Sequence, residues 1–192
     1  EKGAKSVLGT DISQKMLAEA KKKLAQWRKD HPDAGKVAFA QMAMEDMYFG
    51  PECFDLALSS LAFHYAEDLH RLFHRIGTFL PKGGDFVFSR EHPVVTAYGS
   101  QEWIYDEDGK PLHWPVDRYF TLGKRHARFL GEEVVKYHHS LEDVFLALRE
   151  NGFQVRGLSE PQPPAELMDL PGMADEMRRP MMLLIAAKKE RE

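Results

Sequence analysis

The sequence has one cysteine, no long apolar run and no excess of positive charge, and each shortage excludes a class of protein. Cys53 stands alone among the 192 residues, which excludes an internal disulfide and a cysteine-based zinc site and is typical of a reducing compartment. The longest apolar stretch, residues 181–187, is too short to cross a bilayer, and no apolar signal-peptide core follows the charged first residues. These absences predict a cytoplasmic protein with no membrane partner.

The charge balance argues against a nucleic-acid partner. The chain has 26 Lys and Arg against 30 Asp and Glu, a formal net charge of −4, and no basic stripe with interleaved aromatic residues. The composition, 43% hydrophobic and 29% charged, is instead that of a globular protein able to bury a core. We therefore expect a single domain over residues 1–192.

Apolar strands alternate with amphipathic helices in the first half of the chain. Strands are predicted at 6–10, 37–41, 54–59 and 86–88, with helices through 16–27 and 69–79. The strand at 54–59 is apolar enough to be buried on both faces of a parallel sheet. This alternation is typical of an α/β fold with a doubly wound, mostly parallel sheet and right-handed crossovers.

Residues 93–139 break this alternation and form a predicted insertion or lid. A strand pair is expected at 124–129 and 134–137. Five aromatic residues are dense in this segment and either close over a small organic acceptor or pack on the sheet: Trp103, Tyr105, Trp114, Tyr119 and Phe120. Beyond it, Ser140 caps a helix, a strand follows at 153–158, and a last strand is predicted at 181–188.

Four segments together carry a resemblance to a known family. Residues 7–13, 41–47, 54–65 and 80–84 resemble, in order and spacing, a class I S-adenosylmethionine-dependent methyltransferase of the common small bacterial type. The resemblance covers most of the chain. It implies a Rossmann-like sheet of seven strands with an antiparallel last strand, S-adenosyl-L-methionine as cofactor, and methyl transfer to an unidentified small-molecule acceptor.

In that family a first strand and a Gly-rich turn precede the strand that carries the acidic residue. Only Glu1 to Lys5 precede that strand here, so the resemblance implies that roughly 30 or more residues lie upstream. The absent strand is expected to be central, between the strands ending at Asp11 and Ser59, which makes residues 1–192 an N-terminally incomplete domain.

Asp11 is the first candidate for cofactor binding. A carboxylate at the carboxyl end of a strand can accept both ribose hydroxyls of an adenosine cofactor, and a capping or turn role is the alternative. The resemblance adds Ile12 on the adenine face, Met44 and Glu45 at the adenine edge, Ser60 and Leu61 beside the methionine part, and Met16 as a further contact. Ala43 departs from the family pattern, because many relatives carry an acidic residue there.

The candidate catalytic residues are His64, Tyr65, Glu91 and His92, which follow the carboxyl ends of two predicted strands. Each either removes or polarises a proton of the acceptor, or only binds and shapes it. No metal site is expected, because His70 and His74 lack a third ligand. The pair Arg178 and Arg179 either binds a substrate carboxylate or pairs with the acidic residues just upstream.

Two other functions stay open. Asp11 suits the ribose of NAD equally well, which makes a Rossmann-type oxidoreductase the first alternative, although no Tyr-x-x-x-Lys pair for hydride chemistry is present. A non-catalytic methyltransferase-like protein that binds a partner through the aromatic insertion is the second. The sequence does not predict an oligomeric state.

Overall fold

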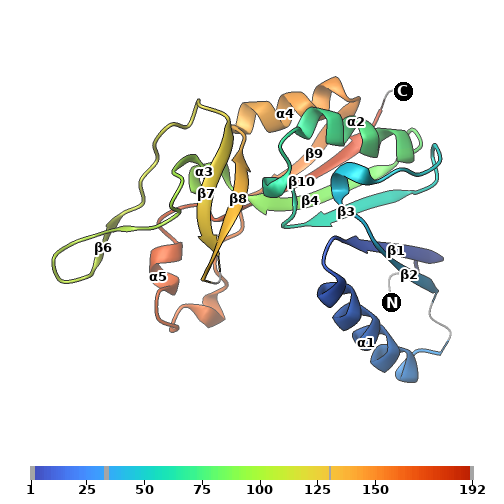
Figure 1. Ribbon diagram of the computed structural model, residues 1–192, viewed down its shortest axis with the longest axis horizontal. Coiled ribbons are helices and arrows are strands. Elements are labelled where there is room, and N and C mark those ends of the chain that lie inside the picture. The colour runs from blue at the N-terminus through green and yellow to red at the C-terminus, as the bar shows by residue number, and fades with distance from the viewer. Residues whose placement is uncertain (1–2, 33–34, 130, 191–192) are drawn as a thin grey trace. The chain divides into compact units, whose positions relative to one another are not determined.

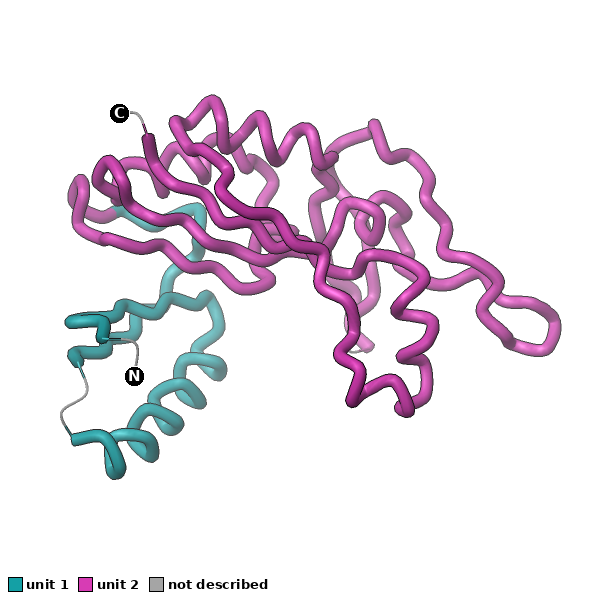
Figure 2. The backbone as a smooth tube through the Cα atoms, turned by 180° about the vertical axis from the view of Figure 1, so that it is seen from behind, with its two compact units in different colours: residues 1–48 teal, residues 49–192 magenta. Residues whose placement is uncertain are grey.

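The structure, a computed structural model, describes residues 3–32, 35–129 and 131–190. It separates into two compact units, residues 1–48 and 49–192 (Figures 1 and 2). The prediction of a single domain stays a prediction. Residues 1 and 2, on which the expectation of no signal peptide partly rests, lie outside the described residues.

Unit 1 is a parallel strand pair joined by a helix. Its elements are β1 (Ser6–Asp11), α1 (Gln14–Asp30), β2 (Lys36–Gln41) and the 3₁₀ turn η1 (Met44–Asp46). The helix begins directly after Ser13, whose hydroxyl caps it by accepting a hydrogen bond from the Met16 N–H at 3.3 Å. The register places Asp11 beside Gln41, so the carboxyl ends of both strands lie at the same edge.

Unit 2 is built on a four-stranded sheet with the order β3-β4-β10-β9. Its elements are β3 (Leu56–Ser60), β4 (Asp85–Glu91), β9 (Phe153–Ser159), β10 (Met182–Lys189), α2 (Leu69–Phe79) and α4 (Leu141–Glu150). Strands β3 and β4 are parallel, and β10 is antiparallel to both of its neighbours, which confirms the expected reversal of the last strand. Helices α2 and α4 pack on each other over the same face of this sheet (Figure 1).

A cluster of phenylalanine rings fills the space between this sheet and its helices. Phe63, Phe73, Phe86 and Phe88 are each at most 2% exposed, and the ring centroids of Phe63 lie 5.2–5.8 Å from the other three. Aromatic pairs at such distances add to the hydrophobic gain from burial. Since Phe63 opens the 3₁₀ turn η2 (Phe63–Tyr65), the core also fixes where His64 and Tyr65 lie.

The insertion forms two hairpins and a short helix. It contains α3 (Pro93–Ala97), β5 (Ile104–Tyr105), β6 (Pro111–His113), β7 (Gly123–Phe129) and β8 (Glu132–His138). The antiparallel pair β7–β8 confirms the strand pair expected at 124–129 and 134–137. Between β9 and β10 lie the 3₁₀ turn η3 (Ala165–Leu167) and the short helix α5 (Met173–Glu176). None of the helices in the described ranges is long and apolar enough to span a membrane.

The expected burial of strand 54–59 on both faces is wrong. Leu56 and Leu58 are 53% and 72% exposed. The register pairs Ala57 with Phe86 and places Ala57 on the face covered by α2 and α4, so the two leucines point to the opposite face. Strands β1 and β3 each pair with one strand among the described residues, and the expected further strand between them stays a prediction.

Candidate functional site

Asp11 lies at the carboxyl end of β1, and one of its two carboxylate oxygens is hydrogen-bonded to a neighbouring residue. Oδ1 accepts a hydrogen bond from the Ser13 N–H at 2.7 Å, which is the turn interaction that the sequence left open. The Asp11 carbonyl accepts from the Met42 N–H at 3.0 Å and ties this end of β1 to the chain after β2. Oδ2 has no hydrogen-bond partner in the part of the chain that the structure describes. A ligand hydroxyl can therefore bind Oδ2 without breaking the turn.

The other candidates of unit 1 surround this edge. Ile12 and Met16 are 69% and 60% exposed, so two apolar side chains close together in sequence offer open surface here. Met44 and Glu45 lie in η1, directly after β2, with Met44 half-buried and Glu45 exposed. Unit 1 thus brings a carboxylate, two exposed apolar side chains and a polar turn to one edge.

Ser60 is the last residue of β3 in unit 2, and Leu61, which follows it, adopts an uncommon backbone conformation. Its φ angle is 51°, in the left-handed region that non-glycine residues rarely occupy. The Leu61 N–H donates to the Ser89 carbonyl at 2.9 Å and to the Ser89 hydroxyl at 3.2 Å, which holds this conformation. The chain therefore leaves β3 abruptly and leads directly into η2, with Ser60 and Leu61 both exposed.

His64 and Tyr65, the first two catalytic candidates, lie side by side, with ring centroids 4.4 Å apart and ring planes tilted by 45°. Burial lowers the pKa of His64 to about 4, although the nearby Glu91 carboxylate acts in the opposite direction. The Glu91 N–H donates to Nδ1 of His64 at 3.3 Å, so the neutral ring carries its proton on Nε2. Burial and then Glu91 raise the pKa of Tyr65, whose hydroxyl has no hydrogen-bond partner within the described ranges.

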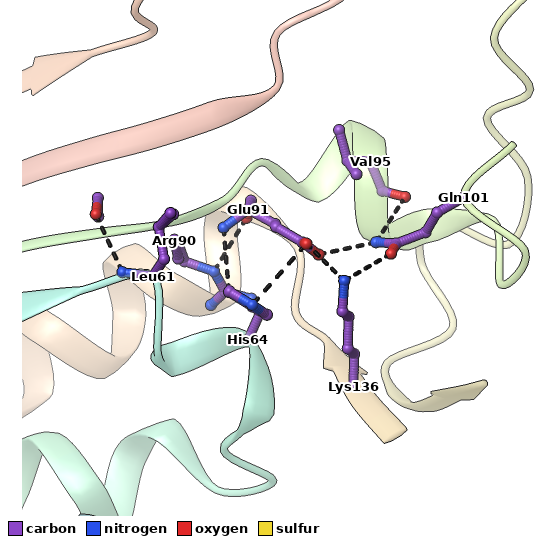
Figure 3. A network of polar contacts seen from close by, with 8 residues as sticks. Leu61, His64, Arg90, Glu91, Val95, Gln101 and Lys136 are labelled. Carbon is purple, nitrogen blue, oxygen red and sulfur yellow. Dashed lines mark hydrogen bonds and ion pairs between the residues drawn. The ribbon is translucent and has the colours of Figure 1, made fainter. Parts of the chain in front are cut away.

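Glu91 is the last residue of β4, and both of its carboxylate oxygens are occupied (Figure 3). Oε1 lies 2.6 Å from Nζ of Lys136, and Oε2 accepts from Nε2 of Gln101 at 2.8 Å. The structure therefore brings three of the predicted residues, Glu91, His64 and Tyr65, close together. It adds Lys136 and Gln101, which the sequence did not predict. The sequence could have indicated Lys136, because in the predicted strand it lies on the same face as Val134 and His138, which is the inward face of β8. No pattern in the sequence indicates Gln101.

His92 is engaged elsewhere. Its Nδ1 accepts from the Val94 N–H at 3.1 Å and caps α3, while Nε2 lies 2.8 Å from Oε1 of Glu160. Burial lowers the pKa of His92, and the Glu160 carboxylate opposes that change. With Nδ1 hydrogen-bonded and Nε2 facing the Glu160 carboxylate, His92 connects β4 to the loop after β9, which favours a structural role over proton transfer.

The arginine pair and the indole rings form a packed layer. Arg178 lies 2.8 Å from Asp175, and Arg179 binds both carboxylate oxygens of Glu176 at 2.9 and 3.0 Å, which confirms the pairing with upstream acidic residues. The guanidinium of Arg179 also stacks 4.0 Å from the ring centroid of Trp114. Of the five aromatic residues proposed as a lid, Phe120 is the most exposed, at 88%, and Tyr105 is 53% exposed, so both rings are accessible to a ligand.

Comparisons with known proteins show what this chain is similar to. A family model described as a methyltransferase domain matches residues 1–88. A crystal structure from Listeria monocytogenes, named provisionally as an S-adenosylmethionine-dependent methyltransferase, is 46% identical, with a TM-score of 0.89, and the match covers 98% of this chain and 82% of that one. An S-adenosylmethionine-dependent methyltransferase from Mesorhizobium loti is 39% identical, with a TM-score of 0.81 and coverage of 97% and 81%.

A curated relative extends the match to a third genus. An uncharacterized protein of Haemophilus influenzae is 31% identical over 195 residues, which cover 98% of this chain and 74% of the relative. These relatives are similar to the chain over both units, so the matched region includes the edge of unit 1 around Asp11 and the cluster of unit 2 around His64.

Proposed function

Because the chain belongs to the S-adenosylmethionine-dependent methyltransferases, with S-adenosyl-L-methionine as its cofactor, we propose that it methylates a small organic molecule held beside Tyr65. The observation that carries the family is the identity of 46% and 39% to two solved methyltransferase-like structures along nearly the whole chain. The family and these relatives give no support to the oxidoreductase alternative. Bacterial origin and the cytoplasm are proposed too, from the organisms of the relatives and from the single cysteine.

The residues of unit 1 fit the adenosine part of the cofactor. The vacant Oδ2 of Asp11 is an acceptor suited to ribose hydroxyls, and the exposed Ile12 and Met16 offer apolar surface to an adenine ring. Glu45, exposed on η1, is the candidate for the adenine amine because Ala43 lacks a polar side chain. We propose Met44, Ser60 and Leu61 as the remaining cofactor contacts.

The bound cofactor supplies an electrophilic methyl group, and the chain's own residues have to orient the acceptor atom toward it. Tyr65 is the group we propose to touch the acceptor, because its hydroxyl is vacant within the described residues and its ring is 36% exposed. Its raised pKa keeps it protonated at neutral pH, so it acts as a hydrogen-bond partner rather than as a phenolate base. His64, with Nδ1 occupied, supports the Tyr65 ring, and Glu91 orients His64.

The proposed cofactor contact of Asp11 is tested by calorimetry with S-adenosylhomocysteine. We expect wild type to bind in the micromolar range and Asp11→Ala to bind about 10- to 100-fold more weakly, because charge-assisted hydrogen bonds to a hydroxyl are lost. Asp30→Ala, at the exposed far end of α1, removes a carboxylate from the same unit and is expected to leave the affinity unchanged.

NAD is the second titrant. Binding of NAD with no binding of S-adenosylhomocysteine would contradict the proposal. Equal affinity of wild type and Asp11→Ala for S-adenosylhomocysteine, with both proteins folded by circular dichroism, would remove Asp11 from the cofactor site. Tight cofactor binding without transfer to any acceptor in a small-molecule screen would favour the non-catalytic alternative.

A further inference from the structure

Lys136 carries a buried ammonium group, which the insertion places beside the cluster of His64, Tyr65 and Glu91. Its side chain is 2% exposed, on the inward face of β8. Nζ donates to Oε1 of Glu91 at 2.6 Å and to Oε1 of Gln101 at 2.8 Å, and it lies 5.4 Å from the Phe129 ring centroid. Burying an ammonium is costly unless it is paired and hydrogen-bonded, and here both conditions are met.

Gln101 closes this arrangement into a ring of contacts. Its Nε2 donates to Oε2 of Glu91, while its Oε1 accepts from Lys136, so each pair among the three residues shares a hydrogen bond (Figure 3). Gln101 also has a φ of 56°, a conformation that a non-glycine residue adopts at a cost. The contacts made by its side chain offset that cost and hold the Glu91 carboxylate in one orientation.

The charge on Glu91 matters because of its distance from His64. Nε2 of His64 lies 3.9 Å from Oε1 of Glu91, too far for a hydrogen bond and close enough for strong electrostatic attraction. The ionisable groups that act on His64 are Glu91 and Arg90 from β4 and Lys136 from β8. The Tyr65 ring from η2 lies beside the same imidazole, tilted by 45°. Glu91 favours a protonated imidazole, whereas Lys136, Arg90 and burial oppose it.

We propose that Lys136 is a positioning residue, through which the insertion holds the Glu91 carboxylate as an ion pair and thereby, together with burial, keeps His64 uncharged beside Tyr65. Removal of Lys136 leaves the buried Glu91 carboxylate without its ion-pair partner, so the attraction of this carboxylate for a proton on His64 is no longer opposed by the Lys136 charge. The pKa of the imidazole then rises, so a charged ring replaces the neutral one beside Tyr65 at a higher pH than in the wild type. The role of His64 and Tyr65 in acceptor binding rests on the proposed function, but the coupling of Lys136 to His64 does not.

The test is an NMR pH titration of the His64 ring in the full chain, without acceptor. We expect Lys136→Met to raise the pKa of His64 by about 1 to 3, the range typical of an opposite charge left unscreened at this separation. Lys136→Arg, which keeps the charge, is expected to restore most of the wild-type value. Lys124→Met, an exposed lysine on the partner strand β7, is the matched control and is expected to have no effect.

The double variant Glu91→Gln with Lys136→Met separates electrostatics from folding. Because it removes both charges, it avoids an unpaired buried carboxylate, and the pKa of His64 is expected to return close to wild type. A folded Lys136→Met protein with an unchanged His64 titration overturns the proposal, as does a double variant that titrates like Lys136→Met. Calorimetry with S-adenosylhomocysteine on the same samples reports on the proposed function separately, so failure of cofactor binding is distinguishable from failure of the coupling.

Discussion

Leu61 adopts a strained backbone conformation that sets the direction in which the chain leaves β3. A left-handed conformation costs a non-glycine residue roughly 1–2 kcal/mol, and Leu61 adopts it at the end of β3 with a φ of 51°. The two hydrogen bonds that its N–H donates to Ser89 hold it there. Strain of this kind is found where the surrounding structure requires a particular geometry, which fits the proposed cofactor contact.

We therefore expect Leu61→Gly to raise the free energy of unfolding slightly, by about 0.5 kcal/mol, because relief of strain exceeds the entropic cost of glycine of roughly 0.5–1 kcal/mol. Affinity for S-adenosylhomocysteine is expected to fall, since the leucine side chain is lost. Urea denaturation and calorimetry measure the two effects. Glu52→Gly, at a φ of 52° in a turn before β3, is the matched control and is expected to change stability alone.

At the scale of elements, the short helix α5 anchors the first hairpin of the insertion. Arg178, just after α5, donates to the carbonyls of Pro111 and Leu112 in β6. Arg179 stacks on Trp114, whose Nε1 donates to the Val94 carbonyl in α3 at 3.1 Å. Three segments distant in sequence are thus held by two adjacent arginines, one half-exposed and one buried.

The two arginines are expected to differ in their contribution to stability. Arg179→Met should lower the free energy of unfolding by about 3 kcal/mol, because it leaves Glu176 without its partner at a site where the arginine side chain is 5% exposed. Arg178→Met should cost about 1 kcal/mol, because its ion pair with Asp175 is solvated. Urea denaturation of both variants measures the two losses in free energy of unfolding. Equal losses would contradict the expectation that burial makes Arg179 the more important of the two.

At the scale of the whole molecule, buried histidines make stability depend on pH. His64, His92, His138 and His139 all have pKa values lowered mainly by burial, those of His64 and His139 to about 4. Each is bound through its neutral ring; His138, for example, lies 2.8 Å from both the Thr96 hydroxyl and the Tyr119 carbonyl. Protonation of these rings therefore opposes folding.

The sign follows from the direction of these shifts. Between pH 6.5 and pH 4 the unfolded chain binds more protons than the folded one, so stability falls as the pH falls through that window. Between pH 7.5 and pH 5, His64 and His139 are each expected to lower the free energy of unfolding by about 2 kcal/mol. Urea denaturation at both pH values tests this. His139→Gln should reduce the difference, whereas His126→Gln, at an exposed position of β7, should not.

Local patterns in the sequence determined most of the elements. The spacing of apolar residues predicted α2 and the pair β7–β8 close to their observed bounds, because periodicity and turn residues act over a few neighbouring positions. Ser140 was predicted to cap α4, and its hydroxyl does accept from the Asp143 N–H at 3.1 Å. The family also followed from short motifs and their order.

Only the tertiary structure decided which distant side chains meet. Lys136 and Glu91 are 45 residues apart in sequence, and Gln101 is 35 residues from Lys136, separations at which no periodic pattern reports a contact. The same limit explains His92, which the motif order grouped with Glu91 although its ring binds Glu160. A sequence shows which faces are apolar through local spacing, whereas the partners of a buried charge depend on how the elements pack, because that packing alone brings residues far apart in the chain within hydrogen-bonding distance.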